Sequence, residues 1–290
     1  MTQVLHYSIS EVAPYINWTY FFHAWRTNEE QSPELLRDAL SLLQELKGQY
    51  QTHALVGLFA ANSDGESTIL IKNEEFLDEP SVTSAERRIK NEGRRKKNEM
   101  KIPFLRQQHG DVCLCWADFV RPIASGKTDT IGLFASSVDE GMEQAYAEDE
   151  YRHMLAQTLA DRLAEATAER MHEEVRKRLW GYAPDEQFTI EEMFQEKYIG
   201  RRPAVGYPSL PDQSLNFLLN DILDFSRIGI RLTESGAMRP HASTSGLLFA
   251  HPQARHFAIG RIGEDQLQDY AHRRGLPIET MRKFLAANLS

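Results

Sequence analysis

The stretch YIGRRPAVGYPSLPDQ, residues 198–213, says more about the fold than any other part of this sequence. It places two arginines, two glycines and several prolines in a segment without helical or strand periodicity, which predicts a rigid, irregular loop. An arginine can donate two parallel hydrogen bonds to a carboxylate or phosphate. A glycine beside a tyrosine allows close backbone approach next to an aromatic ring. Two interpretations of the residues stay open: a surface turn with a solvated arginine, or a loop that holds an anionic ligand.

Helical patterns lie on both sides of this loop. Residues 8–50 are predicted to be helical, because aromatic and leucine side chains recur there at helical spacing. Residues 142–180 carry a stripe of apolar side chains and predict one long helix. Residues 214–229 predict an amphipathic helix that ends at Gly229. Two closing helices are predicted over 265–275 and 277–289.

Strand patterns supply the rest of the chain. Residues 53–73 predict a hairpin whose turn lies at Asn62–Glu66, where Ser-Asp-Gly favours a tight turn. Further strand-like segments occur at residues 111–122, 129–138, 230–238, 243–250 and 254–262. No Gly-x-Gly-x-x-Gly follows a predicted strand, which argues against a dinucleotide-binding α/β sheet.

Composition limits the kinds of partner. The 290 residues carry a formal net charge of −9, so the chain is not expected to be a general nucleic-acid binder. No apolar run approaches the ~18 residues that span a bilayer, and the amino-terminal residues lack the pattern of a signal peptide. We therefore expect a cytoplasmic protein without membrane contact.

The two cysteines, Cys113 and Cys115, are separated by one residue. In a strand they would point to the same face, and this spacing is poor geometry for a disulfide. A metal site would need further soft ligands, and the sequence holds no second cysteine pair. Core packing is the expected role, and no metal site is predicted.

Several motifs resemble, in order, those of the activation domain of cobalamin-dependent methionine synthase. The resemblance covers nearly a whole domain and rests on WTYFFHAW (18–25), VGLFAAN (56–62), WADFVRP (116–122), ADRLAEATAE (160–169), WGYAPDE (180–186), RPAVGYP (202–208), LTESGAM (232–238), SGLLFAHP (245–252) and DQLQDYAHRRG (265–275). It implies an α+β fold: a C-shaped single domain over residues 1–290, with a twisted, mainly antiparallel sheet surrounded by helices. Residues 1–50 would form a helical amino-terminal part, and residues 51–290 the sheet and remaining helices.

The resemblance also implies a function. In that family the domain binds S-adenosylmethionine, so that cobalamin oxidised to the cob(II) state is methylated reductively with an electron from reduced flavodoxin. None of the ten histidines has an aspartate two positions before it, as the cobalamin-ligating motif of these enzymes requires, and the cysteines of their zinc site are missing. The chain is therefore not expected to catalyse methyl transfer from folate to homocysteine alone. The cobalamin would come from a partner domain or subunit, and the sequence fits both a stand-alone subunit and an excised domain.

The family motif carries over to named positions in the loop. It implies that Arg202 binds the carboxylate of S-adenosylmethionine, with Arg201 as the competing candidate. Ala204, Gly206 and Tyr207 would supply neighbouring backbone and ring contacts.

Three further positions belong to the implied ligand site. Glu165 corresponds to a family acid near the ligand, although its position away from the leucine stripe fits a surface acid equally well. Asn17 replaces the usual aspartate, which removes a charge that would strengthen a contact to an ammonium group. His256 replaces a tyrosine, and histidine side chains titrate near neutrality. These two replacements leave an alternative function open: a scaffold that caps a corrinoid protein and has lost S-adenosylmethionine binding.

Three other features have simpler interpretations. His241 and His251 are expected to be loop residues rather than metal ligands, because no second ligand lies at a suitable spacing. Glu234 and Ser235 lack the surroundings of a nucleophile, and the resemblance implies a structural role for them. The basic run Arg94–Lys97 is either a solvated loop or a docking patch for an acidic flavodoxin.

Overall fold

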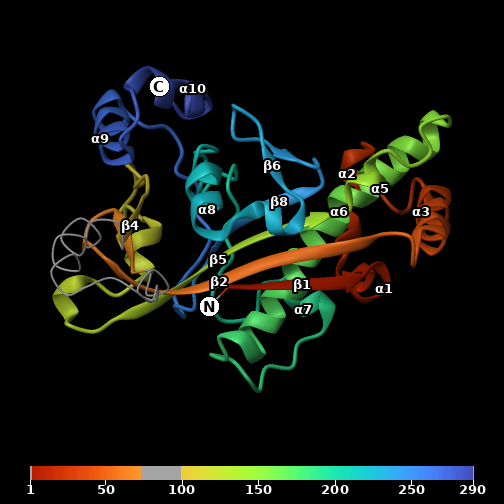
Figure 1. The fold of residues 1–290 in the computed structure, drawn as a ribbon, viewed down its shortest axis with the longest axis horizontal. Helices are drawn as coiled ribbons and strands as arrows, with labels where there is room; N and C mark the ends of the chain where they lie inside the picture. Colours follow the sequence, from red (N-terminus) through yellow and green to blue (C-terminus); the bar gives the residue numbers. More distant parts are fainter. Residues whose placement is uncertain (1, 73–98, 290) are drawn as a thin grey trace, which may run out of the picture.

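The computed structural model describes residues 2–72 and 99–289 of the chain. Its centre is a curled antiparallel sheet whose described strands lie in the order β4-β3-β2-β5-β8, with β1 also paired to β2 (Figure 1). β2 (Gln51–Ser63) organises this sheet, because β1 (Thr2–Ser8) and β3 (Thr68–Lys72) pair with successive parts of one edge. Its other edge pairs with β5 (Asp129–Val138).

The other strands extend the sheet on both sides. β4 (Glu99–Pro103) pairs with β3, and β8 (Ser243–Leu248) pairs with β5. A separate short hairpin is made by β6 (Arg231–Leu232) and β7 (Met238–Arg239). Helices surround the sheet in Figure 1, which confirms the α+β, mainly antiparallel prediction.

The predicted hairpin at residues 53–73 is confirmed as β2 and β3. Its turn depends on Asp64, whose Oδ1 accepts hydrogen bonds from the backbone N–H groups of Glu66 (2.8 Å) and Thr68 (3.0 Å). Gly65 adopts a φ of +89°, a conformation that glycine reaches without steric penalty. The Ser-Asp-Gly sequence thus provides both the hydrogen-bond acceptor and the flexible residue that the turn needs.

The helical prediction for residues 1–50 needs one correction, because Thr2–Ser8 is the strand β1. Ser8 then begins the helical part: its hydroxyl and the Glu11 carboxylate form a reciprocal capping box, which ends the strand. The elements that follow are α1 (Ile9–Val12), the 3₁₀ turn η1 (Ala13–Tyr15), α2 (Trp18–Ala24) and α3 (Pro33–Leu46).

The long helix predicted over residues 142–180 is shorter in the structure. α5 (Glu140–Glu143) is separate, α6 spans Glu150–Glu174, and the π-helical turn η5 (Val175–Leu179) follows directly. α6 begins where the Asp149 side chain accepts a hydrogen bond from the N–H of Arg152. Its leucines and alanines are buried against the sheet, as the stripe indicates.

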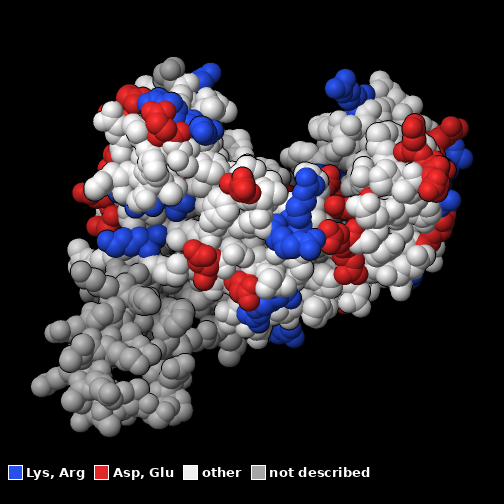
Figure 2. All heavy atoms as spheres, turned by 45° about the horizontal axis from the view of Figure 1, so that its top comes forward, with Lys and Arg blue, Asp and Glu red and all other residues white. Residues whose placement is uncertain are grey.

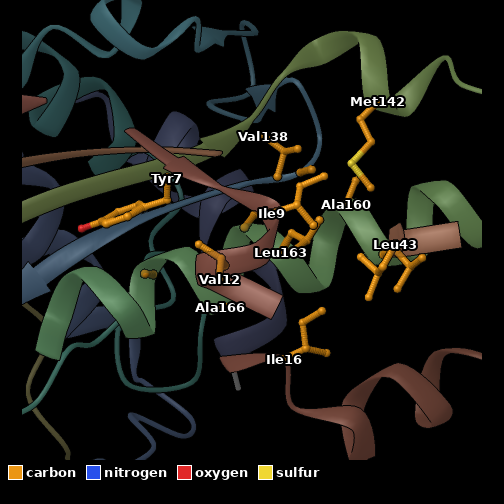
Figure 3. Close-up of a cluster of buried hydrophobic side chains, with 14 of the residues drawn as sticks. Tyr7, Ile9, Val12, Ile16, Leu43, Val138, Met142, Ala160, Leu163 and Ala166 are labelled. Atoms are coloured by element: carbon orange, nitrogen blue, oxygen red, sulfur yellow. The ribbon is translucent and has the colours of Figure 1, made fainter. Parts of the chain in front are cut away.

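The sheet has an apolar core on each face, because alternate residues of β2 and β5 point to opposite sides. Ala54 and Val56 belong to one core, whereas Leu55 and Phe59 belong to the other. Figure 3 shows the first core, in which amino-terminal side chains such as Ile9 and Val12 gather beside Leu163 and its neighbours on α6. Burial on both faces explains why these strands read as nearly continuous apolar runs.

Three predicted strands are wrong. Residues 230–238 contain β6 and the turn that leads into β7, rather than one strand. Residues 111–122 contain the 3₁₀ turn η3 (Trp116–Phe119), because the Asp118 carboxylate accepts the Cys115 N–H (2.8 Å) and closes a turn. The free thiols therefore do not share a strand face: Cys115 is buried and Cys113 half-buried. Residues 254–262 form no strand within the described chain, because the open edge of β8 is already bridged by residues 201–204.

The carboxyl-terminal helices agree with the sequence except at two ends: α8 (Leu215–Leu223) stops early, and α10 (Ile278–Phe284) ends at Phe284 rather than Leu289. α8 stops at Asp224 rather than Gly229, and the 3₁₀ turn η6 (Phe225–Ile228) covers the difference. Asn220 explains the early stop, since its Oδ1 accepts the Phe225 N–H at 3.0 Å. The remaining elements are η4 (Ile123–Ser125), α7 (Ile190–Phe194), α9 (Glu264–Arg274) and η7 (Ala286–Asn288).

The surface is hollowed between two lobes, as expected for a C-shaped molecule (Figure 2). α9 and α10 lie in one lobe, and α3 lies on the opposite side of the molecule (Figure 1). Within residues 2–72 and 99–289, none of the helices has the length and hydrophobicity needed to cross a bilayer. The basic run Arg94–Lys97 lies outside the described residues.

Candidate functional site

A cavity of about 600 Å³ brings together four segments that are far apart in the sequence. They are the start of α2, the middle of α6, the loop from α7 to Ser209, and residues 256–258. Its lining mixes ionic and aromatic side chains. The lining includes Tyr15, Asn17, Tyr20, Arg162, Glu165, Glu169, Phe194, Glu196, Tyr198, Arg202, Ala204, Tyr207 and His256.

The loop is attached to the open edge of β8. Arg201 and Phe249 exchange two backbone hydrogen bonds of 2.9 Å, and the N–H of Leu247 donates to the Pro203 carbonyl at 3.0 Å. Gly246 permits this contact, because a methyl group at that position would collide with the Pro203 carbonyl and lie 2.8 Å from the Phe134 ring. The sheet edge therefore holds the loop in a single position.

The side chains of the two loop arginines have different roles. Arg201 donates from its guanidinium to the carbonyl oxygens of Tyr198 (3.0 Å) and Gly200 (2.6 Å), and its Nε lies 3.1 Å from Glu196. These contacts fasten the loop to itself, and Arg201 is not among the described residues that line the cavity. Arg202 does line it, so Arg202 rather than Arg201 faces the cavity.

Arg202 lies between two carboxylates of α6. Its Nη2 is 3.4 Å from Glu169 Oε2, and its Nη1 is 3.9 Å from Glu165 Oε2. Burial lowers the pKa of Arg202, but the charges of Glu169 and Glu165 more than offset this effect and raise the pKa above its usual value. The Nε atom is buried and has no hydrogen-bond partner among the described residues. The guanidinium is thus always charged and only partly satisfied.

Tyr207 also forms a hydrogen bond with Glu165. Its hydroxyl donates to Glu165 Oε1 at 3.0 Å, while half of the residue, 51%, stays exposed at the cavity. The charge of Glu165, together with burial, raises the pKa of Tyr207 to about 12. The tyrosine therefore stays neutral and keeps its proton for this hydrogen bond at physiological pH.

The two replaced positions both face the cavity. Asn17 caps α2, and its Oδ1 accepts the Thr19 N–H at 3.1 Å, so this oxygen already has a partner. His256 Nε2 lies 3.3 Å from Glu196 Oε1. The hydrogen bond from His256 lowers the pKa of Glu196, although burial acts in the opposite direction. The histidine thus interacts with an acid of the same cavity.

Tyr198 is held in the cavity wall by a buried polar cluster. The Arg176 guanidinium lies 3.9 Å from the centre of the Tyr198 ring and makes a bidentate ion pair with Glu186, with distances of 2.9 Å from its Nε. The His172 ring also meets the Tyr198 ring edge-on, with 5.1 Å between the ring centres. These residues come from α6, η5 and the following turn, so the end of the long helix supports the site.

Most of the residues expected from the sequence meet in this cavity. Six of them, Asn17, Glu165, Arg202, Ala204, Tyr207 and His256, are part of its lining. Gly206 is not among the lining residues in the described chain. Its φ of +90° instead serves the turn that follows Ala204.

Sequence reasoning did not assign seven ionic or polar lining residues of the described chain to the site: Tyr15, Tyr20, Arg162, Glu169, Glu196, Tyr198 and Ser209. Helical spacing contained a signal for Glu169, because it lies four residues after Glu165 and shares its face of α6. Glu196 precedes the loop in a turn with positive φ, and no periodic pattern indicates where its side chain points.

The remaining sequence candidates lie elsewhere. His251 lines a second cavity of about 410 Å³ beside Phe119 and Arg121. The segment with Glu234 and Ser235 forms the turn between β6 and β7, where the hydroxyls of Thr233 and Ser235 are 3.0 Å apart. These contacts agree with the structural role that was expected for the turn.

The chain is similar to proteins of one family. Residues 8–275 match the family described as vitamin B12 dependent methionine synthase, activation domain. Among solved structures, the chain is similar to one described as the crystal structure of the MetH reactivation domain bound to AdoHcy. That match has 35% sequence identity and a TM-score of 0.85, and it covers 100% of this chain and 90% of the other.

Proposed function

Since this chain belongs to the family of activation domains of vitamin B12-dependent methionine synthase, we propose that its 600 Å³ cavity binds S-adenosylmethionine. The domain would thereby support the reductive methylation of cob(II)alamin. Arg202 carries the proposal: it is a charged group on the cavity wall, and its buried Nε has no partner among the described residues. A ligand carboxylate would be a natural acceptor for this guanidinium.

Charge supports S-adenosylmethionine as the ligand. The lining includes the acids Glu165, Glu169 and Glu196 and the guanidinium groups of Arg162 and Arg202. S-adenosylmethionine carries a carboxylate, an ammonium and a sulfonium, so its net charge is positive. A cavity with an excess of carboxylates complements that charge, and the partly buried setting strengthens the attraction relative to open water.

Aromatic side chains beside the cavity support contact with a partner. Tyr20 (58%), Tyr207 (51%) and Phe194 (37%) all line the cavity and are exposed to these extents. Exposed aromatic groups around a ligand site are suited to burial under a second protein surface. We infer that the partner is the cobalamin-binding domain or subunit of methionine synthase, and that reduced flavodoxin or a similar donor supplies the electron. The cobalamin carries the redox and methyl chemistry, and this chain binds and orients the methyl donor.

Substitution of Arg202 by alanine tests the ligand site. We expect Arg202→Ala to weaken S-adenosylmethionine binding by at least ~1.5 kcal/mol, about tenfold, because a charge-assisted hydrogen bond is lost. Isothermal titration calorimetry measures the change. Arg121→Ala, an exposed arginine outside this cavity, is the matched control and should leave affinity unchanged. An absence of binding by the unsubstituted protein would refute the ligand assignment.

One observation favours a second candidate function, a corrinoid-capping scaffold that has lost S-adenosylmethionine binding. Asn17 contributes no charge, and its side-chain oxygen is engaged in capping α2. Asn17→Asp separates the two functions. Under the scaffold function, binding appears only after this substitution, whereas an S-adenosylmethionine site binds without it. A pull-down with a cobalamin-binding domain should succeed under either function.

A further inference from the structure

Glu169 is a buried acid that is incompletely paired. Its side chain is 12% exposed and lines the cavity from the carboxyl-terminal half of α6. Oε2 lies 3.4 Å from Arg202, whereas Oε1 is buried and receives no hydrogen bond from the described residues. Leaving a charged oxygen buried without a donor is unfavourable, so a cationic donor at this oxygen would relieve that cost.

The other two lining carboxylates are better satisfied. Glu165 accepts a hydrogen bond from Tyr207 at one oxygen and lies near Arg202 with the other. Glu196 is paired with His256 through one oxygen and with Arg201 through the other. Glu169 is therefore the lining acid best able to take an additional donor.

The position of Glu169 beside Arg202 defines the group that it would bind. In an α-amino acid the carboxylate and the ammonium are attached to the same carbon, so their binding groups must be neighbours. Arg202 and Glu169 are such neighbours, with 3.4 Å between their charged atoms. The sulfonium of S-adenosylmethionine is separated from the α-carbon by two methylene groups and would lie farther from this pair.

We propose that Glu169 binds the α-ammonium group of the ligand and forms, with Arg202, a clamp for its amino-acid end. This inference rests on the proposed function. The negative charge opposite the ammonium would then come from Glu169 on α6, because Asn17 at the start of α2 is neutral. The ligand ammonium donates to Oε1 of Glu169, and the ligand carboxylate accepts from the Arg202 guanidinium.

A ligand pair that differs only in the amino group tests the clamp. The probes are S-adenosylhomocysteine, which has no sulfonium charge, and its analogue with hydrogen in place of the α-amino group. We expect Glu169→Gln to weaken S-adenosylhomocysteine binding at least about tenfold and to leave the affinity for the deaminated analogue unchanged within about twofold. Calorimetry on the purified chain gives both constants, and their ratio isolates the amino group.

Glu173→Gln is the matched control, because Glu173 lies one turn further along α6 and pairs with Tyr15 and Lys177. This control should leave the preference for the amino group intact. Thermal unfolding establishes that each variant is folded. Glu169→Asp provides a second variant that keeps the charge near Arg202, and it should retain part of the preference for the amino group.

Four results would contradict the clamp. Equal losses for both ligands would show that Glu169 acts only by holding Arg202, and no loss for either would show that it does not face the ligand. Weaker S-adenosylmethionine binding with unchanged S-adenosylhomocysteine binding would assign Glu169 to the sulfonium instead. If the unsubstituted chain binds none of these ligands, the proposed function fails together with the clamp, whereas the other results leave that function in place.

Discussion

His172 shows how a single buried side chain links the site to pH. It is fully buried and lies edge-on to Tyr198 in the cavity wall. Burial, reinforced by the charges of Arg176 and Arg202, holds the pKa of His172 well below 6.5. Near pH 6, His172 therefore binds a proton in the unfolded chain but stays neutral in the folded chain.

This difference predicts a loss of stability in mild acid. Below pH 6.5 the free energy of unfolding should fall by up to about 1.4 kcal/mol per pH unit on account of His172, because protons bind preferentially to the unfolded state. His172→Gln should remove this part of the slope between pH 6.5 and 5. Urea unfolding at several pH values measures it, with His109→Gln, an exposed histidine, as control. An unchanged slope in His172→Gln would contradict the assignment.

At the scale of elements, the backbone contact between the loop and β8 depends on Gly246. Residues 201–204 bridge to the strand at Arg201 and Ala204, and the N–H of Val205 donates to Ser245 at 2.9 Å. Gly246 has a normal φ, so space rather than backbone conformation requires a glycine there. These contacts hold the backbone on both sides of Arg202.

Gly246→Ala should therefore damage the site as well as the fold. We expect destabilisation of about 1–3 kcal/mol, because the added methyl group overlaps the Pro203 carbonyl. S-adenosylmethionine affinity should also fall as the loop moves away from β8. Denaturant titration and calorimetry measure the two effects. Gly141→Ala would bring its new methyl group to 3.1 Å from the edge of the Tyr50 ring, a milder overlap, so it should cost less stability and leave S-adenosylmethionine affinity unchanged; similar losses in both variants would refute the role of Gly246.

At the scale of the whole molecule, the two larger of three apolar cores in the described chain lie on opposite faces of the sheet and share its strands. β2 and β5 each contribute alternate residues to both cores, so neither core can form without the sheet. Trp116 lies in one core, and Trp18, Trp25 and Trp180 pack against the other. We propose on this basis that residues 1–290 form a single domain.

A single domain predicts one cooperative unfolding transition. Two variants separate the cores spectroscopically: Trp116→Phe, and a variant in which Trp18, Trp25 and Trp180 are replaced by phenylalanine. Within each variant, urea midpoints from tryptophan fluorescence and far-UV circular dichroism should coincide, because the shared sheet couples both cores. Separate midpoints or a plateau between two transitions would divide the chain into two domains.

Local sequence chemistry determined much of this molecule. The hairpin at Asp64 and Gly65, the capping box at Ser8 and the end of α9 at Gly275 each depend on a few adjacent residues, so they are readable without the fold. For Arg202 and Tyr207, the loop residues alone left a solvated surface turn open, and only the resemblance to the family motif suggested ligand contact.

Only the tertiary structure decided which of these groups meet. Residues 254–262 have a strand-like pattern but no free edge of β8 to join, since the loop at 201–204 occupies that edge. Glu169 and Glu196 became part of the site because α6 and the segment after α7 are brought against the same loop. Sequence patterns report local propensity and burial, whereas competition for a sheet edge and the pairing of distant charges depend on how the whole chain packs.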